Sequence, residues 1–421
     1  MIGRAVYAAV LWLLLPWLFV RLWWRGRKEP LYRTAVAERF GRYAKAPASG
    51  RPVIWLHAVS LGETRAAQPL FQRLAQAFPG YDFVLTQMTA SGREAAQQLF
   101  GDRARLAWLP YDYGFAVRGF MERFRPSLGI LIETEVWFTL ARICKKARVP
   151  LLLANARLSE KSARGYETVG PLAREAFASL AAVAAQTEED AVRLRRLGAC
   201  GVTVTGNIKF DRVASPGAEA TGRAFKRAWG ERPVFLAAST REGEEELLLE
   251  ALGKQPLPAV TLIVPRHPQR FDEVAALLER RGWAYARRSA NRPLAADCRF
   301  ILGDSLGEMA AYYAAADVAY VGGSLLAYGG QNLIEACAAG APVLVGPYTY
   351  NFEQAAEQAI AGGAARRVAD VTVLLQEAAR LLADAQARRA MGEAGRAFCA
   401  RHRGATERVA TIVEGLLVRR G

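Results

Sequence analysis

The sequence has 421 residues, of which 52% are hydrophobic and 10% aromatic, and this length and composition predict two compact domains and argue against a disordered chain. Lysine and arginine outnumber aspartate and glutamate by 56 to 40, and the net charge of +16 suits nucleic acid, anionic lipid or a phosphorylated substrate. The chain carries no helix-turn-helix, zinc-finger or RNA-binding motif, so we expect no nucleic-acid partner. Its five cysteines are scattered and form no Cys-x-x-Cys pair, which argues against a disulfide framework or a zinc site and favours a reducing compartment.

The first 28 residues predict a membrane anchor. Residues 5–20 are uncharged and apolar, and as a helix they would measure about 24 Å against a bilayer core of about 30 Å, so a spanning helix and an interfacial helix both remain open. Arginines and tryptophans follow this run instead of a small-residue cleavage site, which argues against a secretory signal. The basic cluster places the rest of the chain in the cytoplasm by the positive-inside rule.

From residue 53 onward, short apolar runs alternate with helical patterns, which predicts an α/β fold of two doubly wound, Rossmann-like domains. The alternation is interrupted at residues 207–232 by charges, a proline and glycines. We therefore expect an N-terminal domain at 29–206, a linker at 207–232, and a C-terminal domain at 233–421 that includes the closing helices. The predicted strands lie at 53–59, 83–86, 128–132, 151–154, 182–186 and 202–205 in the first domain, and at 234–238, 260–264, 300–302, 318–321 and 342–345 in the second.

Glu63 follows the first predicted strand and a glycine turn. Because ligands of doubly wound sheets bind beyond the carboxyl ends of the strands, Glu63 is a candidate general base. Ser60 and Glu63 also have the Ser-x-x-Glu spacing of a capping box, in which the carboxylate only satisfies backbone donors. The local sequence leaves both roles open.

Three further charged residues of the first half are candidates for the same sheet edge. Glu133 and Glu135 follow the predicted strand at 128–132, where acids that merely stabilise the start of a helix are also common. Lys209 stands where the first domain meets the linker. It is either a site cation or a solvated linker lysine.

Two strand ends of the second half could bind an anion. Ser239 and Thr240 precede Arg241 at the start of a predicted helix, so backbone amides and a guanidinium could bind a phosphate there. Pro265 and Arg266 end the next strand, where a loop fixed by proline could frame a nucleotide base. Ordinary helix caps and turns have the same sequences.

Glycine-rich segments follow at 303–308, 321–324 and 329–335, and glycine permits close approach of the backbone to a ligand. Gly323 and Ser324 lie in the second segment, and Glu335 in the third is a candidate acceptor for both ribose hydroxyls of a nucleotide. The chain lacks a Walker lysine motif, a Gly-x-Gly-x-x-Gly fingerprint and a His-Glu-x-x-His helix. We expect neither a metal nor a cofactor.

Together these segments resemble the 3-deoxy-D-manno-octulosonic acid (Kdo) transferases of lipopolysaccharide assembly over nearly the whole chain. The matching stretches are 21–28, 57–63, 133–137, 155–159, 265–267, 346–347 and 351–352.

The resemblance implies a GT-B fold with an acceptor-binding N-terminal domain, a C-terminal domain that holds CMP-Kdo, and no required metal. It further implies transfer of Kdo to a phosphorylated lipid A precursor, lipid IVA, at the cytoplasmic face of a bacterial inner membrane. Glu63 matches the family's proton acceptor, and Glu133 and Lys209 match positions that stabilise the transition state. The CMP-contacting segments match Pro265, Arg266, Leu306, Gly307, Glu308, Asn332, Leu333, Ile334 and Glu335.

The chain departs from the family pattern at three positions near the expected donor site. Arg241, Gln331 and Tyr348 stand where the family commonly has histidine, so phosphate contacts would be re-made by Arg241 and Gln331, or the donor would differ. Two competing functions remain: another GT-B enzyme, such as a lipid A disaccharide synthase or a nucleotide-sugar epimerase, and an inactive membrane scaffold.

Overall fold

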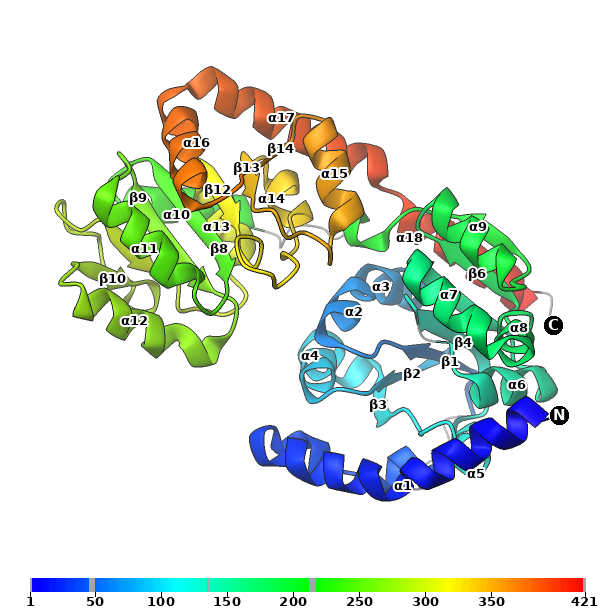
Figure 1. Ribbon diagram of the computed structural model, residues 1–421. Helices are drawn as coiled ribbons and strands as arrows, with labels where there is room; N and C mark the ends of the chain where they lie inside the picture. Colours follow the sequence, from blue (N-terminus) through cyan, green and yellow to red (C-terminus); the bar gives the residue numbers. More distant parts are fainter. Residues whose placement is uncertain (1, 45–49, 135, 212–216, 419–421) are drawn as a thin grey trace. The chain divides into compact units, whose positions relative to one another are not determined.

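The computed structural model describes residues 2–44, 50–134, 136–211 and 217–418. The chain forms two compact units, one of residues Met1–Arg212 with His402–Gly421 and one of residues Val213–Arg401 (Figure 1). In each unit, the described residues form a seven-stranded sheet whose neighbouring strands are all parallel.

The sheet of the first unit has the strand order β3-β2-β1-β4-β5-β6-β7. Its strands are β1 (Val53–His57), β2 (Asp82–Gln87), β3 (Arg105–Trp108), β4 (Pro126–Ile132), β5 (Leu151–Ala156), β6 (Ala182–Ala185) and β7 (Val202–Val204). Its helices are α1 (Ile2–Lys28), α2 (Leu61–Ala66), α3 (Gln68–Ala77), α4 (Ala90–Phe100), α5 (Gly114–Phe124), α6 (Phe138–Lys146), α7 (Glu160–Val169), α8 (Pro171–Phe177), α9 (Glu188–Arg196) and α18 (Ala405–Val418). Short 3-10 helices are η1 (Pro30–Arg33), η2 (Val36–Phe40), η3 (Gly101–Arg103) and η4 (Ile208–Asp211).

The sheet of the second unit has the order β10-β11-β9-β8-β12-β13-β14. Its strands are β8 (Val234–Thr240), β9 (Val260–Pro265), β10 (Tyr285–Arg287), β11 (Phe300–Leu302), β12 (Val318–Val321), β13 (Val343–Val345) and β14 (Ala365–Arg367). Its helices are α10 (Ala218–Ala228), α11 (Glu244–Lys254), α12 (Phe271–Arg280), α13 (Met309–Ala315), α14 (Ile334–Ala339), α15 (Glu353–Ala361), α16 (Val371–Ala383) and α17 (Ala385–His402), with 3-10 helices η5 (Pro268–Arg270) and η6 (Arg288–Ala290).

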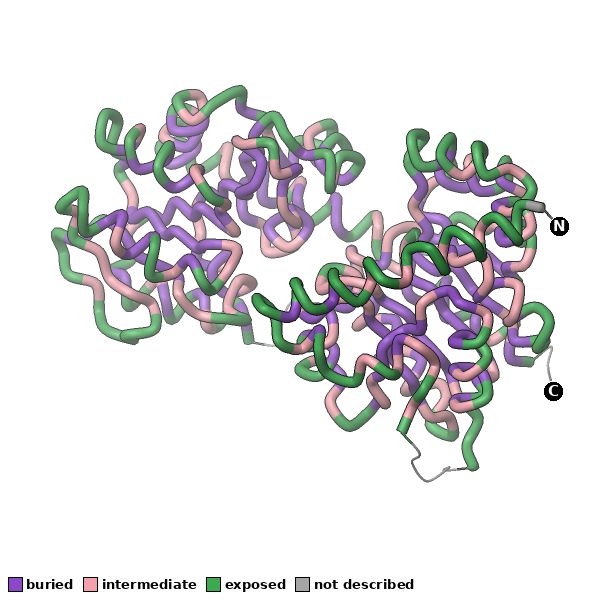
Figure 2. The backbone as a smooth tube through the Cα atoms, turned by 60° about the horizontal axis from the view of Figure 1, so that its bottom comes forward, coloured by how far each residue is buried: buried purple, intermediate pink, exposed green. Residues whose placement is uncertain are grey.

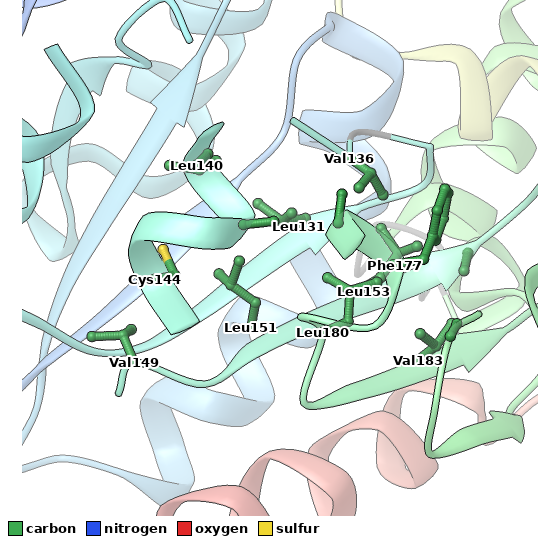
Figure 3. Close-up of a cluster of buried hydrophobic side chains, with 14 of the residues drawn as sticks. Leu131, Val136, Leu140, Cys144, Val149, Leu151, Leu153, Phe177, Leu180 and Val183 are labelled. Atoms are coloured by element: carbon green, nitrogen blue, oxygen red, sulfur yellow. The ribbon is translucent and has the colours of Figure 1, made fainter. Parts of the chain in front are cut away.

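Both faces of the first sheet are buried, as expected for parallel strands covered by crossover helices. Successive strand residues point to opposite faces, so Trp55 and Leu131 pack with α5, α6 and α8, while Ile54 and Ile130 pack with α3, α4 and α18. Figure 3 shows part of the first cluster, in which Leu140 and Cys144 of α6 face Leu131 and Leu151 of the sheet. Figure 2 shows the same layering as buried strands beneath more exposed helices.

The predicted strands are confirmed, and three further strands, β3, β10 and β14, were not predicted. The structure divides the chain differently from the predicted boundaries. The final helix α18 was assigned to the second domain, but Val409 and Val413 lie in the core of the first unit, and Arg73 of α3 pairs with Glu407 at 2.8 Å. The predicted linker is not a linker throughout, since α10 packs on α13 within the second unit, where a Cβ on Gly222 would lie 2.7 Å from the Ala314 Cβ.

The expected anchor corresponds to α1, which is continuous despite Pro16. Among the described residues, α1 is the one helix that is long and apolar enough to cross a membrane by length and composition.

Candidate functional site

Each sheet has a point where the strand order reverses, and doubly wound sheets bind ligands there, beyond the carboxyl ends of the strands. In the first unit the reversal falls between β1 and β4; Glu63 lies in the first turn of α2, the helix after β1, and Glu133 directly follows β4. In the second unit it falls between β8 and β12; Thr240 is the last residue of β8, and Gly323 lies in the loop after β12. The topology therefore gathers the predicted residues of each unit at one sheet edge.

Glu63 has the geometry of a helix-capping glutamate. Ser60 is the N-cap of α2, and its Oγ accepts a hydrogen bond from the Glu63 amide at 3.4 Å. The Glu63 carboxylate accepts from the Val59 amide at 2.8 Å and from the Ser60 hydroxyl at 2.8 Å. Both oxygens of a half-buried carboxylate are thereby held in one orientation at the end of β1. The capping contacts between Ser60 and Glu63 are therefore present, and they also fix the orientation of the Glu63 carboxylate.

His57, at the end of β1, is not an acid–base group at neutral pH. It is fully buried, and burial lowers its pKa to about 4. Its Nδ1 lies 3.0 Å from the carbonyl oxygen of Thr86 on the neighbouring strand. The neutral ring therefore braces β1 against β2.

Glu133 and Lys209 form an ion pair in the first unit. Their side chains approach to 2.6 Å and are 19% and 22% exposed. Glu133 has a left-handed backbone, with φ of 66°, which is rare for a residue with a side chain and is found mainly where surrounding contacts enforce it. The fold thus brings these two predicted site residues together. The third candidate, Glu135, lies outside the described residues.

Asn155 is a positioning residue that the sequence reasoning did not assign. It is the next-to-last residue of β5, has a left-handed conformation with φ of 54°, is fully buried, and accepts a hydrogen bond from the Ile208 amide through Oδ1 at 3.0 Å. Asn207 Oδ1 accepts from the Lys209 amide at 2.9 Å. These bonds fix η4, and with it the start of the Lys209 side chain. The available signal was an asparagine at a strand end, since Asn tolerates this conformation well.

In the second unit, Thr240, Arg266 and Gln331 are joined by hydrogen bonds. The Arg266 amide donates to the Thr240 carbonyl at 2.9 Å, and its Nε donates to Gln331 Oε1 at 3.1 Å. Pro265 is paired with Thr240 across the two strands, and Ser239 is left-handed at φ 56° beside a register shift in β8. Two of the predicted donor residues, Thr240 and Arg266, are therefore hydrogen-bonded in one cluster with Gln331, and Ser239 and Pro265 are their neighbours along the chain.

Glu244 organises this edge of the second sheet, although no sequence pattern had singled it out. It is 1% exposed and accepts four hydrogen bonds. Oε2 accepts from the amides of Arg241 at 2.9 Å and Gly323 at 2.6 Å, while Oε1 accepts from the Tyr320 hydroxyl at 2.6 Å and the Leu325 amide at 3.0 Å. One buried carboxylate thus ties the loop after β8 to the glycine loop after β12.

The next residue, Glu245, makes the corresponding link to the loop after β9. Its Oε1 accepts from the Thr240 hydroxyl at 2.7 Å and from Arg270 Nη1 at 2.6 Å. Burial raises the pKa of Glu245, and the bonds to Arg270 and Thr240 oppose that rise. Consecutive buried glutamates therefore connect three neighbouring loops at the carboxyl edge of the sheet.

Replacing Glu244 with glutamine should destabilise the second unit by about 3 kcal/mol, because the amide NH₂ group cannot accept and two of the four donors would lose their partner whichever way the amide is turned. Chemical denaturation measures this loss. Glu246→Gln is the matched control, since Glu246 is exposed in the same helical turn and should change stability by less than about 0.5 kcal/mol. Equal stability of the two variants would show that Glu244 does not hold these loops.

The remaining predicted donor residues lie in three segments, at 323–324, 332–335 and 306–308. Ser324 Oγ accepts from the Gly346 amide at 2.8 Å. Asn332, which precedes α14, donates through Nδ2 to Oε1 of Glu335 in the first turn of that helix at 3.2 Å. Leu333 and Ile334 are buried packing residues, so only their backbone could face a ligand.

Residues 306–308 follow β11. Leu306 is 73% exposed and Gly307 has φ of 82°. Glu308 accepts from Arg288 at 2.9 Å and from Ser305 at 2.5 Å. These bonds anchor the loop to η6 through Arg288. Across the described part of the chain, no group of three or more His, Cys, Asp or Glu side chains is arranged to hold a metal ion.

Comparison with known proteins identifies the family. A family model described as 3-deoxy-D-manno-octulosonic-acid transferase (kdotransferase) matches residues 34–212, and one described as glycosyl transferases group 1 matches residues 284–398. A 3-deoxy-D-manno-octulosonic acid transferase of Bordetella pertussis is 48% identical over 99% of this chain and 100% of its own length. The chain belongs to the Kdo transferase family. The corresponding protein of Haemophilus influenzae is 33% identical over 99% of both chains.

Solved structures agree with this fold. The UDP-GlcNAc 2-epimerase of Neisseria meningitidis bound to UDP-GlcNAc has a TM-score of 0.59 at 14% identity and covers 87% of this chain and 100% of its own. HepE of Anabaena in complex with UDP has a TM-score of 0.57 at 13% identity, with 86% and 100% covered. At such identities the likeness shows the fold alone, which is GT-B. This member of the Kdo transferases is a GT-B glycosyltransferase.

The three positions at which the resemblance implied histidine have different surroundings. Gln331 accepts the bond from Arg266, and the Arg241 guanidinium lies 4.4 Å from the ring centre of Tyr328 and 3.0 Å from Glu242. The Tyr348 amide donates to the Ser324 carbonyl at 3.0 Å, and its side chain is exposed. Gln331 thus belongs to the hydrogen-bonded cluster of predicted donor residues, Arg241 directly follows Thr240 of that cluster, and Tyr348 is bonded to Ser324 through its backbone.

Proposed function

We propose that this Kdo transferase moves Kdo from CMP-Kdo to a phosphorylated lipid A precursor, lipid IVA, at the cytoplasmic face of a bacterial inner membrane. The observation that supports this most is family membership over the full chain, combined with the gathering of the family-matching residues at the two switch points. The apolar helix α1 supports membrane attachment, and the net charge of +16 suits a phosphorylated acceptor.

The proposed reaction is a single inverting displacement. Glu63 accepts the proton of an acceptor hydroxyl as that oxygen bonds to the anomeric carbon of Kdo, while the bond from that carbon to the phosphate oxygen breaks and CMP leaves with its electron pair. The transition state has oxocarbenium character, so it needs negative charge near the carbon and positive charge near the departing phosphate. The Glu133 carboxylate would stabilise the positive charge at the anomeric carbon. Lys209 and Arg266 would stabilise the negative charge of the anionic groups.

The donor would be bound by the second unit. Backbone amides and side chains of Ser239, Thr240, Gly323 and Ser324 would face the phosphate together with Arg266, and Pro265 with Leu306, Gly307 and Glu308 would frame the base. Glu335 would accept from the ribose hydroxyls, assisted by Asn332 and the backbone of Leu333 and Ile334. No metal or cofactor enters this scheme.

Mass spectrometry of the lipid formed by the purified enzyme from CMP-Kdo and a tetraacylated acceptor tests the function. We expect a product heavier than the acceptor by at least one Kdo. Turnover of a UDP-sugar without use of CMP-Kdo would favour another GT-B activity, and the absence of turnover with every donor would favour an inactive scaffold.

Glu335→Gln should weaken CMP binding by about 1–3 kcal/mol, because a neutral amide loses the charge-assisted bonds to the ribose. Isothermal titration calorimetry measures the change. Glu353→Gln is the control, since Glu353 occupies the first turn of the next helix, α15, and is exposed. If both variants bind CMP like the unmodified enzyme, Glu335 does not belong to the donor site.

A further inference from the structure

One flank of α1 packs against the rest of the first unit along most of the length of the helix. Near its start, Arg4 pairs with Glu175 of α8 at 2.6 Å, and the Tyr7 hydroxyl donates to Asp112 at 2.9 Å. Farther along, Phe19 stacks on Phe40 with ring centres 5.2 Å apart. Leu22 is 7% exposed and packs against Tyr32 and Ala90. The helix is therefore part of the folded unit.

The other flank of α1 is apolar and exposed. Val6, Leu13 and Val20 are 56%, 80% and 62% exposed, and they lie on one stripe because they are spaced by seven residues, about two helical turns. The sequence places no charged residue between Arg4 and Arg21. The exposed large apolar side chains of this helix are Val6, Val10, Trp12, Leu13, Leu14, Trp17, Phe19, Val20, Trp23 and Trp24.

The contacts of α1 with the first unit are incompatible with a helix that spans the membrane. Arg4 and Leu22 are separated by about 27 Å along a helix axis, which nearly equals the thickness of a bilayer core. If α1 crossed the membrane with its contacts intact, Asp112 and Glu175 would enter the hydrocarbon, where carboxylates are strongly disfavoured. If these contacts broke, the unit would lose the Arg4–Glu175 ion pair, the hydrogen bond from Tyr7 to Asp112 and the packing of Leu22.

Deepening the proposed membrane attachment, we propose that α1 lies in the plane of the cytoplasmic leaflet, with the first unit on one flank and lipid on the other. The occupant of the apolar flank is an anionic bilayer. Indole rings prefer the membrane interface, and exposed tryptophans lie along α1 from Trp12 to Trp24. Arg21 lies 5.4 Å from the ring of Trp17 and Arg27 lies 4.0 Å from that of Trp23, so cations flank the apolar surface where lipid phosphates would be.

A cavity beneath the first half of α1 has the same mixed chemistry. It measures about 430 Å³, and its lining includes the aromatic rings of Trp12 and Phe115, the cations Arg4, Arg118 and Arg142, and the carboxylates Asp112 and Glu175. Glu175 is paired with Arg4, and Asp112 accepts from the Tyr7 hydroxyl. The three lining arginines outnumber the two carboxylates, so a positive excess lies beside apolar side chains and complements the phosphate and acyl chain of a lipid. A helix lying in the membrane plane would bring this cavity to the lipid surface.

Depth-dependent fluorescence quenching tests this orientation in the full-length enzyme. With exposed Cys200 replaced by serine, single variants Val6→Cys, Leu13→Cys and Val20→Cys carry a fluorophore in vesicles of phosphatidylethanolamine and phosphatidylglycerol whose quenchers lie at known depths. We expect the three labels to report one shallow depth, about 5–10 Å below the headgroups. Val192→Cys, exposed on α9, is the control and should show no lipid quenching.

Two other outcomes would contradict this expectation. A Leu13 label at the bilayer centre with shallower Val6 and Val20 labels would overturn the in-plane orientation and leave membrane attachment intact. Labels that no lipid quencher reaches would overturn membrane attachment through α1 itself, and a protein partner or a second copy would then cover the apolar flank.

Cysteine labelling in intact spheroplasts gives an independent reading. Gly3→Cys should not react with a membrane-impermeant maleimide, because an in-plane helix keeps its N-terminus in the cytoplasm. The space around Gly3 can accept the new side chain, since nothing in the described part of the chain lies within 4 Å of an added Cβ. Labelling before lysis would place this end of α1 in the periplasm and contradict the proposal.

Discussion

Replacing Glu63 with glutamine should lower kcat for Kdo transfer by about 10²-fold or more, the range expected when a general base is removed. Glutamine keeps the shape of the side chain, and its amide oxygen can still accept one capping hydrogen bond, but it cannot take a proton at neutral pH. Melting temperature and CMP affinity should change little, because Gln also serves in capping boxes. Steady-state kinetics at saturating donor and acceptor measure the effect.

Ser60→Ala separates capping from catalysis at this position. It removes the hydroxyl that bonds both the Glu63 amide and the Glu63 carboxylate, and loss of an N-cap costs about 0.5–2 kcal/mol of stability. We expect Ser60→Ala to lose stability and keep most of its turnover, the opposite of Glu63→Gln. A folded Glu63→Gln enzyme with near-normal kcat would sink the assignment, and Glu133 or Glu135 would become the next candidate.

The strands that sequence reasoning missed share one physical property. β3, β10 and β14 are edge strands of three or four residues, and each contains arginine, as in Arg105, Arg287 and Arg367. Central parallel strands are continuously apolar because both of their faces are buried, whereas edge strands tolerate charge and short length. The search for apolar runs therefore identified the central strands of both sheets and missed three edge strands.

The place of α18 could not be predicted from its own sequence. Its apolar stripe, with Val409 and Val413, predicts a helix that packs on something, but the pattern does not say which domain provides the partner. The structure answers through contacts distant in sequence: Asp211 accepts from the amides of Gly404 at 2.6 Å and Thr406 at 2.5 Å. The chain thus returns to the first unit to complete its core.

The residues missed at the site are buried polar groups. Asn155 and Glu244 touch no substrate in the proposed mechanism, and their importance comes from bonds to Ile208 and Gly323, far away in sequence. Motif and spacing arguments find residues at strand ends, such as Glu133 and Arg266, because topology alone brings those to one edge. They do not find the side chains that hold the loops there.

Lys209→Met should reduce kcat by about 10²-fold, since it removes a preorganised cation from the proposed transition-state machinery. Methionine has a similar length and no charge. The variant also leaves Glu133 without the ammonium that lies 2.6 Å away, so some stability will be lost together with activity. Kinetics alone cannot distinguish that loss from a catalytic role.

Lys226→Met is the control that separates the two effects, because Lys226 makes a similar ion pair with Asp317 at 2.6 Å. The side chains of Lys226 and Asp317 are 28% and 18% exposed, and those of Lys209 and Glu133 are 22% and 19% exposed. Its partner Asp317 precedes β12 and lies at the opposite, amino end of the strands, where it accepts from the Val234 amide at 2.8 Å. Breaking either pair should therefore lower stability to a similar extent, while only Lys209→Met should lower kcat when both variants are assayed well below their melting temperatures. A Lys209→Met enzyme with the turnover of Lys226→Met would show that the cation only holds Glu133 and η4 in place, and that Arg266 or another residue stabilises the departing phosphate.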